Sequence, residues 1–350
     1  MLKKLYIAIT LAAVLSLLAP AAYAAEGTTT GSFGAASSTP EVTAVDIYDT
    51  TDPNCTGSPI TDMTPQTEYY YAKISVTSNS KLKQLETVQV TLFYNDGTDP
   101  NMSAPVAGDV YDCAILTCTI GAPPGYAISW SYDFGTSITW ELHEAGCQSP
   151  TSLDDTSGDW IFAFRPGKVA RENTGAALWN VQGYAENRND AKNDDLYVRN
   201  KNMMWYGEVT VADTADWGEV PLGLTFDDIT SNPETGIDVT YIANGDYYED
   251  ISSEDWTSGG ETVTLVSLAT DDTPPANPGE FALKANWENN LTVAQIVTEN
   301  PTYAHIKSDE TITTETGNLV NTNTLWLSLS DSGILPGTYT GTIWYQIVTR

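Results

Sequence analysis

Apolar and polar residues alternate along most of the chain from residue 41 onward. In residues 70–76 every second side chain is apolar, and residues 87–94 repeat this pattern. A period of two places the apolar side chains on one face of an extended segment, which predicts β-strands with one buried face. Further segments of this kind span residues 42–49, 127–134, 137–144, 159–166, 177–186, 203–211, 236–245, 262–268, 280–286, 323–330 and 338–348.

Turn-forming residues separate the predicted strands, as in Asn95-Asp96-Gly97. Antiparallel strands with one apolar face pack as two facing sheets, so the pattern predicts an all-β protein built from antiparallel, Ig-like β-sandwiches. A polar, turn-rich segment at residues 212–223 divides the strands into two sets. We therefore predict two sandwich domains in tandem, over residues 41–211 and 215–350, each of ordinary domain size.

The first 40 residues have a different composition. Lys3 and Lys4 precede an apolar run over residues 5–18, and residues 22–24 read Ala-Tyr-Ala. This order predicts a signal peptide over residues 1–24 that is cleaved on export. Residues 25–40 are mostly Gly, Ser, Thr and Ala, which predicts a flexible leader; a strand donated to a neighbouring subunit is the alternative. No later apolar run is long enough to span a membrane, so the mature chain is expected to lack a transmembrane segment.

The last two predicted strands are expected to form a hairpin around Ile334. In that register one face is aliphatic, whereas the other is polar and carries Trp326 and Trp344 as diagonal neighbours. We expect domain 1, another subunit or a ligand to cover this second face. Trp326 and Trp344 are therefore the predicted interface or ligand residues.

The chain is strongly acidic. It has 46 Asp and Glu residues against 15 Lys and Arg, a formal net charge of −31. Such a surface repels phosphates and anionic lipid headgroups, which argues against nucleic acid as a partner. Only 17% of the residues are charged and 10% are aromatic, which is typical of an extracellular β-protein rather than of a disordered acidic segment.

Four cysteines follow the signal peptide, at positions 55, 113, 118 and 147. An even number in an exported chain predicts two disulfides, and the sequence leaves the three pairings of Cys55, Cys113, Cys118 and Cys147 open. The alternative is a zinc site formed by Cys113, Cys118, His143 and Cys147, but this requires reduced thiols. Export favours the disulfides.

The sequence contains no recognisable catalytic set. The chain has two histidines, and neither lies in a nucleophile motif, a phosphate-binding loop or an HExxH motif. Carboxylates are plentiful, so a pair of glycosidase carboxylates is conceivable; Glu141 and Glu144, which flank His143 beside a tryptophan, are an example. An acidic surface produces such a pair by chance, so we predict that the protein is not an enzyme.

Oxygen ligands for calcium gather in one polar loop. Asp190, Asp194 and Asp195 lie among asparagines, and Asp49 and Asp52 form a smaller group. Carboxylate and amide oxygens are the ligands that Ca²⁺ prefers, although neither loop has the EF-hand register. Calcium is thus the candidate ion, and no cofactor is expected to be required.

Three N-x-[ST] sequons provide candidate glycosylation sites, at Asn54, Asn101 and Asn290. N-glycosylation adds a bulky, solubilising group at the protein surface. These asparagines are therefore expected to be exposed.

Residues 61–97 resemble the leading segment of Ig-like repeats in exported envelope proteins of archaea and some bacteria. Residues 216–223 together with residues 337–347 are similar to the last domain of such proteins. The resemblance covers most of the mature chain and implies a structural or adhesive role at the cell surface without catalysis. Many of these proteins carry a C-terminal anchor, whereas this sequence ends on a predicted strand; we therefore expect retention by contact.

These observations predict a non-catalytic, extracellular structural protein. We expect a subunit of a surface layer (S-layer), sheath or filament, or an adhesive envelope component, held by self-assembly or by other envelope proteins. Unpaired edge strands supply a means for such contacts. The alternative is a secreted module that binds a carbohydrate or another ligand through exposed aromatic side chains.

Overall fold

A computed structural model of the chain describes residues 39–99, 101–189, 191–193, 197–228, 235–317 and 321–350. The predicted signal peptide and all but the end of the predicted leader lie outside the described residues. Within these ranges the structure contains β-strands and three 3-10 turns but no α-helix, which confirms the all-β prediction. The 3-10 turns are η1 (Leu82–Gln84), η2 (Glu144–Gly146) and η3 (Leu291–Val293).

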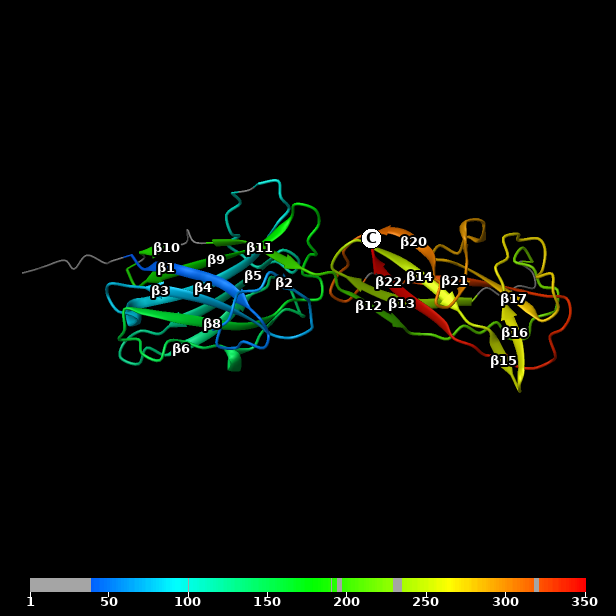
Figure 1. Ribbon diagram of the computed structural model, residues 1–350, viewed down its shortest axis with the longest axis horizontal. Helices are drawn as coiled ribbons and strands as arrows, with labels where there is room; N and C mark the ends of the chain where they lie inside the picture. Colours follow the sequence, from blue (N-terminus) through cyan, green and yellow to red (C-terminus); the bar gives the residue numbers. More distant parts are fainter. Residues whose placement is uncertain (1–38, 100, 190, 194–196, 229–234, 318–320) are drawn as a thin grey trace, which may run out of the picture. The chain divides into compact units, whose positions relative to one another are not determined.

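The N-terminal half of the described chain forms two sheets, which we call the N-terminal sheet pair (Figure 1). One sheet has the strand order β1-β3-β8-β7. The other has the order β2-β11-β9-β4-β5-β6, with β10 paired to β9. The bounds of these strands are β1 (Glu41–Tyr48), β2 (Asp62–Met63), β3 (Tyr70–Thr77), β4 (Leu85–Asn95), β5 (Cys113–Ile120), β6 (Ile128–Asp133), β7 (Glu141–Leu142), β8 (Ser157–Arg165), β9 (Leu178–Asn187), β10 (Lys192–Asn193) and β11 (Tyr197–Met203).

The predicted alternation explains the core between these two sheets. Along β3 the side chains alternate strictly between buried and half-buried, beginning with the buried Tyr70. The buried face meets the apolar side chains of β4, β8 and β9, among them the fully buried Trp160 and Trp179. Apolar surface removed from water stabilises the fold by about 25 cal/mol per Å², so two buried indoles are a large contribution.

The remaining strands form the C-terminal sheet pair around a second apolar core. One sheet has the order β12-β13-β21-β17-β16-β15, with β18 paired to β17. In the other sheet, β19, β20 and β22 all pair with β14. The bounds are β12 (Gly207–Val211), β13 (Thr235–Ala243), β14 (Tyr247–Ser253), β15 (Trp256–Ser258), β16 (Glu261–Leu265), β17 (Glu280–Asn286), β18 (Gln295–Ile296), β19 (Thr298–Glu299), β20 (Ala304–Glu310), β21 (Asn321–Leu329) and β22 (Ile343–Thr349).

The predicted hairpin between the last two strands is wrong. Strand β21 pairs with β13 and β17, whereas β22 pairs with β14 in the other sheet (Figure 1). Trp326 and Trp344 therefore do not share a face. Trp326 is 5% exposed and packs with Phe226 and Ala282, while Trp344 lies opposite Ser252 on β14. The connection between the strands is long enough to cross from one sheet to the other, a choice that strand periodicity does not encode.

The predicted segment 203–211 is divided between the two sheet pairs. Its first residue ends β11, whereas Gly207–Val211 forms β12 and pairs antiparallel with β13. The hydrogen bonds of β12 thus place it with the C-terminal sheets, although the boundary predicted from composition lay after Val211. By contacts between residues, the described part of the chain belongs to a single compact unit.

Candidate functional site

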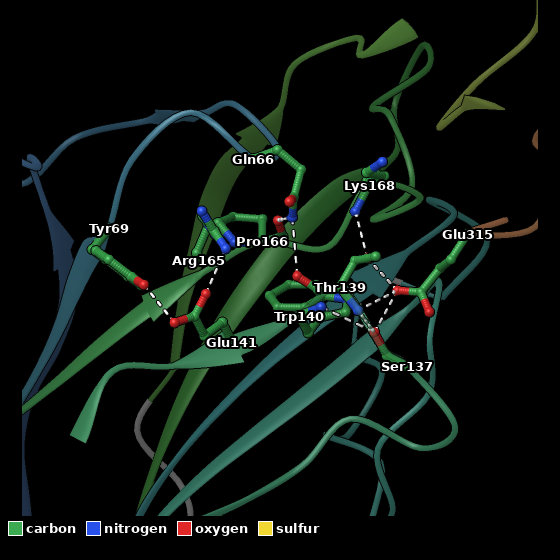
Figure 2. A network of polar contacts seen from close by, with 10 residues as sticks. All are labelled: Gln66, Tyr69, Ser137, Thr139, Trp140, Glu141, Arg165, Pro166, Lys168 and Glu315. Atoms are coloured by element: carbon green, nitrogen blue, oxygen red, sulfur yellow. Dashed lines mark hydrogen bonds and ion pairs between the residues drawn. The ribbon is translucent and has the colours of Figure 1, made fainter. Parts of the chain in front are cut away.

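A polar network joins the two sheet pairs through Glu315 (Figure 2). Glu315 follows β20 and is 9% exposed. Its carboxylate accepts hydrogen bonds from the backbone N–H of Ile138 (2.7 Å) and of Thr139 (3.1 Å), and from the hydroxyl groups of Ser137 and Thr139. A buried carboxylate is costly unless its oxygens are hydrogen-bonded, and here the 137–139 turn supplies the donors.

The turn that holds Glu315 is itself fixed by further hydrogen bonds. The Ser137 hydroxyl accepts from the backbone N–H of Trp140 at 3.0 Å, and the Thr139 hydroxyl accepts from the N–H of Lys168 at 2.9 Å (Figure 2). The Lys168 ammonium pairs with Glu208 on β12 at 2.7 Å. This contact lowers the pKa of the Glu208 carboxyl below its usual value.

Asn244 makes a second connection between the sheet pairs. It is fully buried directly after β13. Its amide donates to the carbonyl oxygens of Ala170 and Met204, at 2.8 and 2.9 Å, and its side-chain oxygen accepts from the N–H of Tyr206 at 2.7 Å. The backbone carbonyl of Asn244 also accepts from Glu172. Because both ends of the side-chain amide are satisfied, burial of Asn244 costs little and fixes the geometry of the connection.

Glu141 is part of a surface ion pair. Its carboxylate accepts from the Tyr69 hydroxyl and from the Arg165 guanidinium, each at 2.5 Å (Figure 2). The hydrogen bond to Glu141 raises the pKa of Tyr69. His143 stacks on the Tyr69 ring at 4.7 Å between centroids. Glu144 begins the 3-10 turn η2. The carboxylate of Glu141 thus forms hydrogen bonds with both Tyr69 and Arg165.

None of the four cysteines is bonded to another in the structure, and the two disulfides stay a prediction. Cys113 and Cys118 lie five residues apart on β5 and therefore face opposite sides of the sheet. Cys118 faces the large core, whereas Cys113 packs against Phe93 and Ile115 on the other side. Cys113 and Cys118 also belong to the alternative zinc site, and their positions on opposite faces of the sheet keep them apart. No group of three metal-binding side chains occurs among the described residues.

Buried free thiols and disulfides differ in their reactivity toward thiol reagents, and this difference can be measured. Loss of hydration raises the pKa of Cys55, Cys113 and Cys118 to about 12 and that of Cys147 to about 11. We expect the native protein at pH 8 to react with fewer than one equivalent of a disulfide reagent such as DTNB, and the protein in guanidinium to react with all four thiols. Two native disulfides would leave no reactive thiol in unreduced, denatured protein.

Asp190, Asp194 and Asp195 of the predicted calcium loop lie outside the described residues. In the smaller acidic group, Asp49 accepts from the N–H and the hydroxyl of Thr51, both at 2.8 Å. Asp52 accepts from the N–H of Gly57 at 2.7 Å. These hydrogen bonds lower the pKa of both carboxyls. Both carboxylates therefore stabilise their own turn.

The three predicted glycosylation sites lie on the surface. Asn54, Asn101 and Asn290 are all exposed. The side chain of Asn290 accepts a hydrogen bond from the N–H of Thr292 at 3.1 Å, within its own sequon. Their exposure makes all three accessible to modification, which itself stays a prediction.

Trp344 lies on the outward face of the sheet formed by β14, β19, β20 and β22. On the same face Asp250, although its side chain is only 3% exposed, contacts the His305 ring and accepts from the Gln346 amide at 3.2 Å. Tyr248 packs on His305 at 4.8 Å between ring centroids. Trp344 therefore belongs to a mixed polar and aromatic surface that the sequence did not reveal, because its polar members come from three separate strands.

Strand β22 forms an unbroken antiparallel ladder with β14, seven residues long and without a register shift. Beyond its ends, Glu254 N–H donates to the Thr342 carbonyl at 3.3 Å and Arg350 N–H donates to the Asp246 carbonyl at 3.1 Å. Both bonds join directly opposite residues in this register. Hydrogen-bonded pairs alternate along an antiparallel ladder, so residues 344, 346 and 348 bond to β14 as residues 342 and 350 do. The backbone N–H and C=O groups of residues 343, 345, 347 and 349 therefore point away from β14.

The outer edge of β22 has no strand partner among the described residues. Its residues have properties that favour pairing, since the strand contains no proline, lysine or bulge. Edge strands that avoid association usually carry one of these features. The sequence predicted the strand itself, but the open edge follows only from its partner in the fold.

The chain matches no protein-family model and no curated protein. The likeness to exported Ig-like repeats thus stays a prediction from the residues. Among the described residues, no helix has the length and apolar character needed to cross a membrane.

Proposed function

We propose that the chain is an exported, non-catalytic structural protein of the cell surface. It is a subunit of a layer, sheath or filament, or an adhesive envelope component, held by contacts with copies of itself or with other envelope proteins. The observation that carries the proposal is the outer edge of β22, which pairs with no strand in the part of the chain that the structure describes. An unpaired, regular edge offers a row of backbone donors and acceptors on which a strand of another subunit adds to the sheet.

The connection between the sheet pairs supports the same function. A structural subunit must transmit force from one contact to the next without bending. The buried Glu315 and Asn244 satisfy donors and acceptors on both sides of the connection, which favours one fixed arrangement of two tandem, Ig-like β-sandwich domains. The predicted signal peptide and the acidic composition support a location outside the cell.

The proposal predicts that proline at the open edge of β22 blocks assembly. Proline lacks the N–H group that an added strand requires. The variant Ile343→Pro/Thr349→Pro removes two outward N–H groups at the ends of the strand, whereas Ile343→Ala/Thr349→Ala removes the same side chains and keeps the N–H groups. Electron microscopy of the purified mature protein should show ordered polymers for the wild type and the alanine variant but not for the proline variant.

Circular dichroism and thermal melts must first show that both variants fold. Polymers formed equally well by the folded proline variant would contradict assembly through this edge. A wild-type protein that stays a monodisperse monomer with and without calcium would contradict self-assembly altogether.

A further inference from the structure

A cavity of about 850 Å³ opens in the C-terminal sheet pair. One wall is formed by strands of the larger sheet, with the buried side chains of Val263, Phe281 and Leu327. Two segments outside the strands also line the cavity, residues 215–220 with Leu222, and residues 334–339. The volume lies within the range of about 300–1,000 Å³ that is usual for small-molecule sites, and the buried wall is apolar.

Aromatic rings form part of the cavity wall. Trp217 and Trp256 are 5.6 Å apart between centroids, and Trp256 lies 4.9 Å from Phe281. The indole N–H of Trp256 donates to the Ser253 hydroxyl at 3.2 Å, which holds the orientation of its ring. The ring faces of tryptophan attract cations and pack against apolar groups.

The rim combines exposed apolar side chains with negative charge. Leu222 and Leu335 are 47% and 58% exposed. Asp216 and Glu219 belong to the same loop as Leu222, and no lysine or arginine occurs among the described residues that line the cavity. The net charge of the whole chain is −31. The potential at the mouth of the cavity therefore favours a cation over an anion.

We propose that this cavity binds a small organic cation with an apolar body, such as an alkylammonium ion. The alkyl part lies against the buried apolar wall and displaces water from it, as for other apolar ligand sites. The ammonium group lies at the rim, where the tryptophan faces and the carboxylates of Asp216 and Glu219 stabilise its charge. This site is independent of the edge of β22, so it does not depend on whether the protein assembles.

Three probes of similar alkyl chain length test the proposal: octyltrimethylammonium, octan-1-ol and octanoate. Each is titrated, below its micelle concentration, into the full mature protein and followed by calorimetry and tryptophan emission. We expect saturable one-to-one binding of octyltrimethylammonium, weaker binding of octanol, and octanoate binding at least about tenfold weaker than the cation. Octanoate binding as tight as that of the cation, or a cation titration that never saturates, would overturn the proposal.

Variants locate the site. Asp216→Asn/Glu219→Gln should remove most of the preference for the cation over octanol. Glu261→Gln/Glu299→Gln, which neutralises two exposed carboxylates outside the cavity lining, should retain it. Thr338→Trp places a large side chain at the exposed rim and should abolish binding of the cation and of octanol while the protein stays folded. Undiminished binding to folded Thr338→Trp, or an equal loss of preference in both charge variants, would place the ligand elsewhere and refute the site.

Discussion

Deletion of residues 338–350 is expected to unfold the C-terminal sheet pair. The deletion removes β22 and with it the seven-residue ladder to β14. It also removes Ile347, which is 8% exposed in the second core, and the adjoining Ile343 and Tyr345. Burial of side chains of this size contributes about 1.5–3 kcal/mol each, so their combined loss is comparable to the whole stability of about 5–15 kcal/mol of a typical domain.

Amide hydrogen exchange measures this result for each sheet pair separately. In the deleted protein we expect peptides from residues 235–317 to lose protection, while peptides from residues 41–189 keep theirs. Arg350 provides the matched control, since its removal deletes the backbone hydrogen bond to Asp246 and leaves the seven-residue ladder in place. A truncated protein that keeps a native melt and native protection would show that β22 is not part of the core.

Replacement of Glu315 by alanine should destabilise the protein by about 3 kcal/mol. The substitution leaves the Ile138 and Thr139 N–H groups and two hydroxyls without their acceptor. Hydrogen bonds to a charged group contribute about 1.5–3 kcal/mol, and the part-buried donors left without an acceptor add to the loss. Glu315→Gln keeps one acceptor oxygen and should lose less. Urea unfolding measures the free energy of unfolding of each variant.

The control for Glu315 is Glu299→Ala. Glu299 is exposed, and we expect its replacement to change the free energy of unfolding by less than about 0.5 kcal/mol. A double-mutant cycle with Thr139→Val separates the interaction itself, because coupled residues give non-additive effects. Additive effects of the two substitutions, or a native-like stability of Glu315→Ala, would show that this contact does not join the sheet pairs.

The strand positions could largely be predicted from the sequence. The predicted segments 70–76, 87–94 and 280–286 correspond to β3, β4 and β17, and the last of these has the predicted bounds. Side chains alternate across a strand, so a half-buried strand shows its character in its own residues. The prediction failed where both faces of a strand are covered. Strands β5 and β14 are buried on nearly every residue, and their alternation is lost.

The candidate sites were less predictable, because their residues are far apart in the chain. Nothing near Glu315 in the sequence indicates that it contacts residues 137–139, about 180 positions earlier. For the cysteines, the even number in the sequence suggested disulfides but left the pairing open. The structure places Cys113 and Cys118 on opposite faces of β5, so these two cannot pair with each other.

The final strand separates what the sequence alone determined from what the tertiary structure decided. The alternation within residues 343–349 determined that this segment is a strand and which side chains face the core. Its partner did not follow from the sequence, because backbone hydrogen bonds are the same for every strand and register depends on how whole faces pack. Only the fold showed that β22 pairs with β14 and not with β21, which places Trp326 in the interior, Trp344 on the outward face, and an open edge at the side of the sheet.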